Sequence, residues 1–461
     1  MKRFYDALSA PIIPVGFLLC AGLATLLLPS AVTAQDRSKP PFTIFEAVRM
    51  GVASHPRTAT ARAKEDVAVA ERRRATAARW PGLSFEGTGT GFQEPMIVAP
   101  LHVFDPTQPP VFARTLFQSR WFAGYTLFDG GERAANIDRA TAASLRANSS
   151  TAAAEMQVMQ SVATAYINVT TATRILEAEN LRHSSIQRER GRVAQFFEAG
   201  RTAEVEVLRA DAALALARAS QVVAQQDLEA TWRELCRLVD VPPDSLVPAQ
   251  LQSVVALPDL EFQVDDLVSR ALSANPGLAA TGHEVDAAEA AARGARSAWL
   301  PHVQVMAGVV TFAGSGASLT GEWQGGLSVS YPIFTGGLRS ARIAGANASA
   351  EAAAAAHREH ALEIALGIDR LVAHLRASRT RSEALTRAVE YAAEVARIEQ
   401  LALTAGAGVQ TDFLEAEAEL FSARANLERA RHAELSSLIA LAQVTGDLSL
   451  EWLQENVEAG Q

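Results

Sequence analysis

The pattern of apolar and polar positions changes from a helical to an extended period once in each half of this chain. Between Phe42 and Ser54, apolar side chains recur every three or four residues, which predicts an amphipathic helix. Between Leu83 and Phe92, polar residues alternate with small or apolar ones, which is the period of a strand. The same reading predicts further helices at 57–79 and 277–298 and further strands at 117–128, 303–312 and 323–334.

Two much longer segments follow the predicted strand pairs. Residues 132–199 and 339–405 contain no proline and are rich in alanine, the residue with the highest helix propensity. A continuous helix over the first segment would be about 100 Å long, so it needs packing partners along its whole length. Return helices are expected at 202–240 and 409–444. Two short helices placed end to end are long enough to flank each long one.

The two halves form an internal repeat. Tyr125–Gly131 and Tyr331–Gly337 each lead from a strand into a long helix, and they lie 206 positions apart. Ala199-Gly200 and Ala405-Gly406, where the long helices end, have the same spacing. An internal repeat of this kind is stronger evidence for the fold class than any single motif. The glycines expected at the strand-to-helix turns are Gly130, Gly131, Gly336 and Gly337.

The repeat sets the expected domain boundaries. They are a signal peptide at 1–34, a first repeat at 35–240 with a β-hairpin at 83–128, a connector at 241–262, a second repeat at 263–447 with a β-hairpin at 303–334, and a tail at 448–461 that we expect to fray.

The N-terminus has the features of an export signal. Lys2 and Arg3 precede an apolar run at 12–28, and Ala34 offers a cleavage site. A transmembrane anchor is the alternative, because the run is near the minimum length for a span. Leu19 before Cys20 does not fit a lipoprotein signal, so we expect no lipid anchor there.

Composition excludes some function classes. The formal net charge of −9 argues against a nucleic-acid surface. Beyond the N-terminal segment no apolar run reaches about 18 residues, so no helix is expected to cross a bilayer. The predicted strands could enter a membrane only as part of a closed β-barrel. In the strand at 323–334, Trp323, Leu327 and Val329 share one face and Gln324 and Ser328 the other, as expected for lipid outside and water inside.

These features together resemble the outer membrane efflux protein (TolC-like) family over essentially the whole chain after the signal peptide. The resemblance depends on the two strand-to-helix turns, on the order of the elements, and on helix stops such as Asn275-Pro276 and Leu300-Pro301. It also depends on the helix turns, which continue as Glu206–Ala210 in the first repeat and as Asp412–Ala416 in the second.

The resemblance implies a homotrimer in the bacterial outer membrane. Each protomer would give four strands to a shared twelve-stranded barrel, and its helices would form a tunnel through the periplasm. It further implies a passive channel of an efflux or type I secretion system that works with a periplasmic adaptor and an inner-membrane transporter. No cofactor is expected. Four strands leave two open edges, which agrees with a barrel shared between chains.

The resemblance also assigns residues to the two helix turns. Adaptor contact falls on Gly200, Arg201, Thr202, Gly406 and Gly408. Asp412 and Glu415 match an acidic ring at the tunnel entrance; stabilisation of the helix N-terminus by negative charge is the alternative. Glu206 matches an acid that pairs across the turns in the family. Its partner position is Gly408 here, which leaves Arg209 as the candidate replacement in the gate. Thr202 is expected to cap the return helix.

Other chemistry finds little support in the sequence. Gly87, Gly89 and Gly91 resemble a phosphate loop, but no helix follows them directly. His357 and His360 share a helix face without a close third ligand, which favours a solvated face over a metal site. No nucleophile elbow is present, so an enzyme is not expected. A structural periplasmic coiled-coil protein without a pore is the remaining rival, and the alternating strands argue against it.

Overall fold

The computed structural model describes residues 42–98, 107, 110–245, 247–256, 263–314 and 319–459. The chain divides into two units, Met1–Pro40 and Pro41–Gln461, and the following concerns the second. The predicted signal peptide and Cys20 lie outside the described residues. Among the residues described, no helix has both the length and the apolar character that crossing a bilayer requires.

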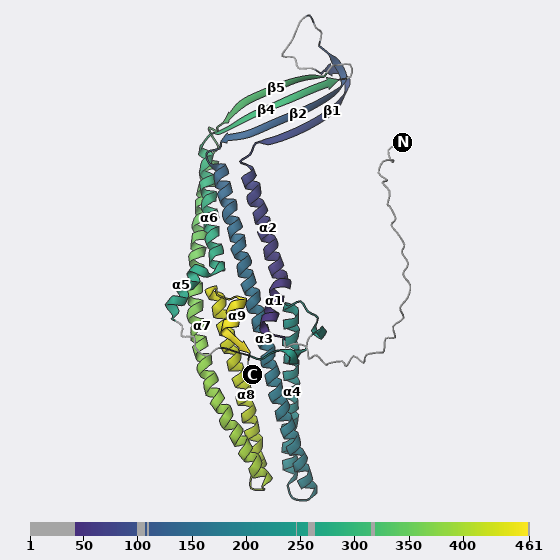
Figure 1. Cartoon of the computed structure of the whole chain (residues 1–461), viewed down its shortest axis with the longest axis vertical. Coiled ribbons are helices and arrows are strands. Elements are labelled where there is room, and N and C mark those ends of the chain that lie inside the picture. Colours follow the sequence, from purple (N-terminus) through teal and green to yellow (C-terminus); the bar gives the residue numbers. More distant parts are fainter. Residues whose placement is uncertain are drawn as a thin grey trace, which may run out of the picture. The chain divides into compact units, whose positions relative to one another are not determined.

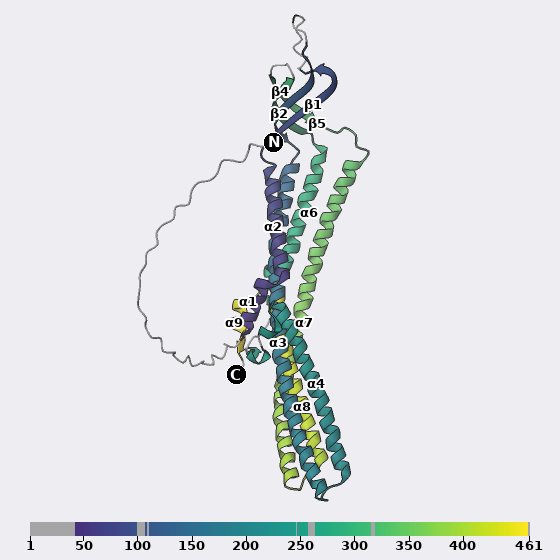
Figure 2. The same ribbon diagram turned by 90° about the vertical axis from the view of Figure 1, so that its right-hand side faces the viewer.

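Two helices of 67 residues, α3 (Glu132–Glu198) and α7 (Leu338–Thr404), run the length of the helical part (Figure 1). Along α3 lie α2 (Pro56–Ala77) and α4 (Glu204–Leu238); along α7 lie α6 (Pro276–Arg296) and α8 (Gln410–Thr445). Figure 2 shows the same end-to-end arrangement from the side. The expected flanking of each long helix by two short ones is therefore observed. Contacts of α6 and α8 with α3 join the two repeats.

Each repeat begins with a short helix that ends at a proline. These helices are α1 (Ile44–Ser54) and α5 (Val264–Ala274). In both repeats the residue before the proline caps the next helix: His55 Nδ1 accepts from the Arg57 amide at 3.1 Å, and Asn275 Oδ1 accepts from the Leu278 amide at 3.0 Å. Proline is well suited to the first helical position because the amide it lacks would have no partner there.

The four predicted strands form one antiparallel sheet with the order β1-β2-β4-β5. The strands are β1 (Gly82–Ile97), β2 (Phe112–Phe128), β4 (His302–Gly314) and β5 (Thr320–Ser330). Pairing of β2 with β4 joins the two hairpins, so β1 and β5 are left as the edges.

The second hairpin is shorter than predicted. Strand β5 ends at Ser330, so Tyr331, Ile333 and Phe334 lie beyond it, although the alternation placed them in the strand. Ser330 pairs with His302, and the residues that would continue the ladder on the two strands include Pro301 and Pro332. Proline has no amide hydrogen to donate, which ends the pairing there.

The start of the return helix also differs from the sequence prediction. Helix α4 begins at Glu204, two residues later than expected, and its N-cap is Ala203, which makes no side-chain hydrogen bond. Thr202 therefore does not cap this helix, and the capping prediction was wrong. The acidic residues Glu204 and Glu206 in the first turn stabilise the positive end of the helix instead.

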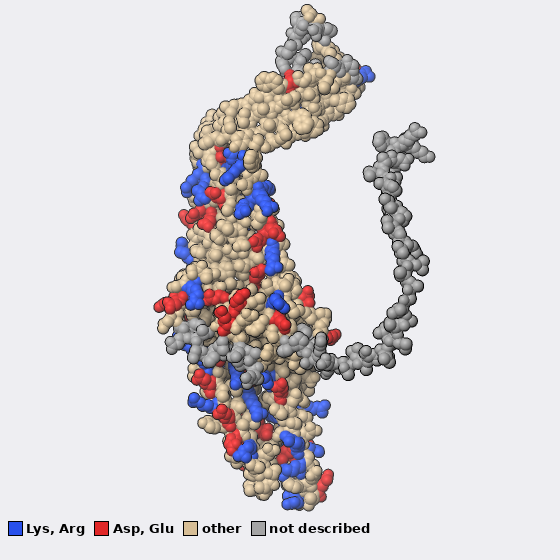
Figure 3. All heavy atoms as spheres, viewed as in Figure 1, with Lys and Arg blue, Asp and Glu red and all other residues tan. Residues whose placement is uncertain are grey.

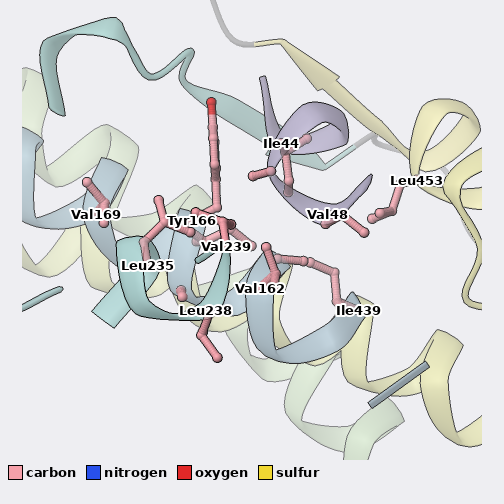
Figure 4. Close-up of a cluster of buried hydrophobic side chains, with 14 of the residues drawn as sticks. Ile44, Val48, Val162, Tyr166, Val169, Leu235, Leu238, Val239, Ile439 and Leu453 are labelled. Atoms are coloured by element: carbon pink, nitrogen blue, oxygen red, sulfur yellow. The ribbon is translucent and has the colours of Figure 1, made fainter. Parts of the chain in front are cut away.

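The main hydrophobic core lies at the middle of the helical part, where α1, α3, α4 and α8 meet (Figure 4). Its members include Val162, Tyr166, Leu235 and Ile439, all of which are fully buried. A second core joins α5, α6, α7 and α8 around Ile368. Both cores therefore hold the short helices against the long ones near their midpoint.

The C-terminal tail belongs to this core, and the prediction that it would fray was wrong. It forms helix α9 (Leu450–Asn456) and strand β6 (Val457–Ala459), which pairs with β3 (Val254–Ala256) in the connector. Leu448 and Leu453 are buried in the main core. The connector also contains two 3-10 turns, Pro243–Ser245 and Pro248–Gln250.

Tyr166 ties the connector to the core. Its hydroxyl lies 2.7 Å from the Phe42 carbonyl and 2.9 Å from the Gln252 carbonyl, and it accepts from the Gln252 amide at 2.8 Å. In Figure 4 its oxygen points away from the aliphatic side chains. Burial raises the pKa of this phenol far above its ordinary value, so it stays protonated and can donate.

We expect Tyr166→Phe to lower the free energy of unfolding by about 1–3 kcal/mol, because it removes the hydroxyl that bonds the Phe42 and Gln252 backbone groups in the core. Thermal unfolding followed by circular dichroism measures the change. Tyr391→Phe is the matched control, since Tyr391 is 71% exposed. Equal unfolding temperatures for the two variants would contradict this role.

Candidate functional site

The two turns that join the long helices to their return helices lie together at the end of the helical part away from the sheet (Figures 1 and 2). Gly200 and Gly406 adopt φ angles of +68° and +77°, a left-handed conformation that glycine enters without strain. The Arg201 amide donates to the Phe196 carbonyl at 2.7 Å, and the Ala407 amide donates to the Ala402 carbonyl at 2.9 Å. The two turns are thus built alike, and both glycines occupy the conformation that a turn requires.

Gly408 has a different reason to be glycine. Its φ is not in the left-handed region, but a Cβ at this position would lie 2.7 Å from the Leu403 amide nitrogen. The turn passes too close to the end of α7 for a side chain. Thr202 lies half-buried in the other turn, and the guanidinium of Arg201 stacks 5.1 Å from the centre of the Phe196 ring.

The two turns are bonded to each other through Glu206. Its backbone carbonyl accepts from Gln410 Nε2 at 3.1 Å. Its carboxylate accepts from Arg209 Nη1 at 2.9 Å, and the same nitrogen lies 3.4 Å from Thr411 Oγ1 on the other return helix. The structure therefore brings Glu206 and Arg209 together and places them against the start of α8. Gln410 and Thr411 were missed, because neither carries a charge or a motif that marks it in the sequence.

Asp412 and Glu415 lie exposed on one face of the first turns of α8. Neither forms an ion pair with another residue of the described part of the chain. Glu419 lies on the same face and is also exposed. Its spacing of four residues from Glu415 was the signal available in the sequence. Unpaired carboxylates in a row give this face a negative potential.

The strand-to-helix turns form the second set of predicted residues. Gly130, Gly131, Gly336 and Gly337 all have left-handed φ angles between +59° and +90°. The tight turn at each strand end explains the paired glycines, because a residue with a Cβ is strained in this conformation.

Two arginines that follow these turns were missed by the sequence analysis. Arg133 Nη1 donates to the carbonyls of Thr126 at 2.9 Å and Ala78 at 3.3 Å. Arg339 donates to the carbonyls of Ile333 at 3.1 Å and Ala298 at 3.4 Å. Arg133 therefore joins the end of α2 to β2, and Arg339 joins the end of α6 to the turn after β5. Their spacing of 206 residues was the available signal.

The histidines on α7 make contacts within the protein. His357 Nδ1 lies 2.8 Å from Thr281 Oγ1, and His360 Nδ1 lies 3.3 Å from the carboxylate of Glu363. Within the described residues, no group of three or more His, Cys, Asp or Glu side chains is arranged to hold a metal ion.

A sequence profile of the family described as "Outer membrane efflux protein" matches residues 51–239 and 267–447. The chain belongs to this family. It is 26% identical to the alkaline protease secretion protein AprF of Pseudomonas aeruginosa over 286 residues, which cover 58% of this chain and 57% of AprF. It is 27% identical to protein CyaE of Bordetella pertussis over 311 residues, covering 65% of this chain and 64% of CyaE. The matches thus span about three fifths of these relatives.

Solved outer membrane channels have the same fold. The outer membrane protein VceC of Vibrio cholerae matches with a TM-score of 0.73 at 20% identity, covering 87% of this chain and 96% of VceC. The CmeC outer membrane channel of Campylobacter jejuni matches with a TM-score of 0.77 at 16% identity, covering 89% of this chain and 88% of CmeC. The predicted family and fold class, mainly helical with a four-stranded sheet per chain, are confirmed. The protein is located in the outer membrane, with its helical part in the periplasm.

Arg209→Ala should loosen the contact between the two helix turns, because it removes the only side chain in the described structure that bridges Glu206 and Thr411. A half-exposed pair contributes at most about 1 kcal/mol, so the population with separated turns should rise by up to about fivefold. Distances between spin labels introduced by Thr202→Cys and Ala407→Cys measure it. Arg218→Ala is the control on the same helix, and distance distributions that match in both variants would rule out the bridge.

Proposed function

We propose that this chain forms the outer membrane duct of a tripartite export system. It conducts cargo passively from the periplasm to the exterior and performs no catalysis. The family is one of efflux channels, which supports a channel in preference to an enzyme.

The two faces of the sheet are the observation that carries this proposal. Phe85, Trp121, Val309 and Trp323 are successive pairing partners and form a row across all four strands. They are 45–82% exposed, although they are apolar. On the opposite face the neighbouring row holds the ion pair of Glu86 and Arg120 at 3.5 Å. One face suits lipid and the other suits water, as in the wall of a water-filled pore.

The edges of the sheet support a trimer. Strands β1 and β5 have no partner within the described chain on their outer sides. Unpaired backbone groups do not remain in lipid, so neighbouring copies must supply the partners. Three copies around one axis give a barrel of twelve strands, and cyclic symmetry closes it without free edges.

The helix turns support the partner assignment. In this proposal Gly200, Arg201, Thr202, Gly406 and Gly408 face a periplasmic adaptor protein, which links the duct to an inner-membrane transporter. Asp412, Glu415, Glu206 and Arg209 form the gate. AprF bears the name of a protease secretion protein and BepC of Brucella suis that of an efflux protein, so both cargo classes fit this duct.

Purification tests the proposal directly. The protein should migrate as a heat-sensitive trimer from outer membrane extracts and should conduct ions in planar bilayers. A pore-less periplasmic coiled-coil protein would leave the exposed aromatic row without a function. A water-soluble monomer without conductance would refute the duct.

Three copies of Asp412 and Glu415 would place six carboxylates around the entrance. We expect the double change Asp412→Ala with Glu415→Ala to weaken block by multivalent cations about tenfold, a change of roughly 1.4 kcal/mol in binding. The half-blocking concentration in planar bilayers measures it. Asp265→Asn with Asp266→Asn, at exposed positions at the start of α5, removes the same charge elsewhere. If block were equally strong in both double variants, the entrance ring would be excluded.

A further inference from the structure

The helix ends next to the sheet carry an excess of arginine, which we call the arginine collar. Its members are Arg72, Arg73, Arg74, Arg79, Arg133, Arg139, Arg293, Arg296, Arg339 and Arg342. Within the same distance of these helix ends lie five carboxylates, Glu71, Asp129, Glu132, Asp138 and Glu289. The collar region, with ten arginines, thus has a formal charge of +5 in a chain whose net charge is −9. Figure 3 shows basic side chains directly below a sheet surface that is almost free of charge.

The collar is narrow along the helix axes. No member lies more than seven residues from the helix end that adjoins the sheet, which corresponds to about 10 Å. Arg133 and Arg339 are engaged by backbone carbonyls, but the other eight are exposed. Three of these eight form ion pairs with described residues; the other five, Arg72, Arg73, Arg79, Arg139 and Arg296, form none.

Exposed apolar side chains lie between the collar and the strands. Trp80, Ile333 and Phe334 are 78%, 87% and 89% exposed, and all three lie in the connections between helix and strand. Aromatic residues at such a level are typical of the boundary between hydrocarbon and headgroups. The collar therefore begins where the apolar surface ends.

We infer that the arginine collar binds the phosphate groups of anionic phospholipids in the periplasmic leaflet of the outer membrane. The headgroup layer of one leaflet is about 5–8 Å thick, which matches the depth of the collar. Arginine side chains extend toward the interface and bind phosphate through two parallel hydrogen bonds. The inference rests on the outer-membrane location and not on export, so it can fail while the duct stands.

The test compares two triple variants of the full-length protein. Arg72→Gln, Arg73→Gln and Arg79→Gln remove three unpaired collar charges from the end of α2. Arg218→Gln, Arg381→Gln and Arg387→Gln remove three exposed charges from the distal helices. Native mass spectrometry of the protein in neutral detergent counts bound phosphatidylglycerol and phosphatidylcholine. Inorganic phosphate is added as a competitor, and circular dichroism verifies that each variant is folded.

We expect the unaltered protein to prefer phosphatidylglycerol by at least about tenfold. Each arginine near an anionic surface contributes roughly fivefold, so the collar variant should lose most of the preference and the distal variant should retain it. The preference should fall with rising salt. The inference is overturned by an unaltered protein without preference or by a collar variant that keeps it. Displacement by millimolar inorganic phosphate would show a free-anion site, and altered ion selectivity with unchanged lipid binding would place the arginines in the tunnel; both overturn it.

Discussion

The backbone groups on the outer edges of β1 and β5 constrain everything else in this protein. Within the chain, β2 and β4 are paired on both sides, whereas β1 and β5 are paired on one. An amide or carbonyl without a partner costs several kcal/mol in hydrocarbon, and water cannot satisfy it there. In the proposed duct, copies of the chain supply these partners, and the helices that continue from the strands surround the same axis.

The junctions between sheet and helices transmit this arrangement. Arg133 and Arg339 bond the end of one helix to the start of the next, so strand direction and helix direction are fixed together. At this junction the two repeats approach closely. A Cβ on Gly130 of the first repeat would lie 2.7 Å from Cβ of Leu300 in the second. The close approach of the two repeats at this point requires glycine for packing as well as for its positive φ. The two β-hairpins therefore form one sheet that continues into a joined set of helix ends.

The sequence predicted the parts of the fold that repeat or have a strict period. The two long helices, the four strands and the turn glycines were all identified, because helical and extended periods differ and the same spacing occurs twice. The tail was missed because the core in which Leu448, Leu453 and Val457 are buried is completed by residues of α1 and α3, more than 270 positions away, which no local period records. The end of β5 was missed because alternation continues past the prolines that end the pairing.

The candidate site was predicted less completely than the fold. Charged residues and glycines at the turns were recognised, but their partners Gln410 and Thr411 are ordinary polar residues. The contact through Arg209 depends on how the helix turns of the two repeats pack against each other, and that packing is a property of the tertiary structure. The prediction that Thr202 caps the return helix also failed. Thr202 has a suitable side chain, but α4 starts at Glu204 and its N-cap is Ala203.

The distribution of buried apolar surface determines where the helical part separates most easily. At mid-length, fully buried leucine, isoleucine and valine side chains hold α3, α4 and α8 together. Toward the helix turns the buried apolar cluster around Ala396, Ala416 and Leu420 is small, although Ile186 and Phe413 are also buried there. The interface of α3 with α8 contains polar contacts such as Ser185 with Glu417 at 3.0 Å. Glu179 is nearly fully buried there, and burial raises the pKa of its carboxyl. Each such contact contributes far less to the free energy of helix packing than a buried leucine, because polar groups form hydrogen bonds with water when the helices separate. The end that carries the proposed gate is thus held in part by polar contacts, whereas a large aliphatic cluster holds the wall together at mid-length.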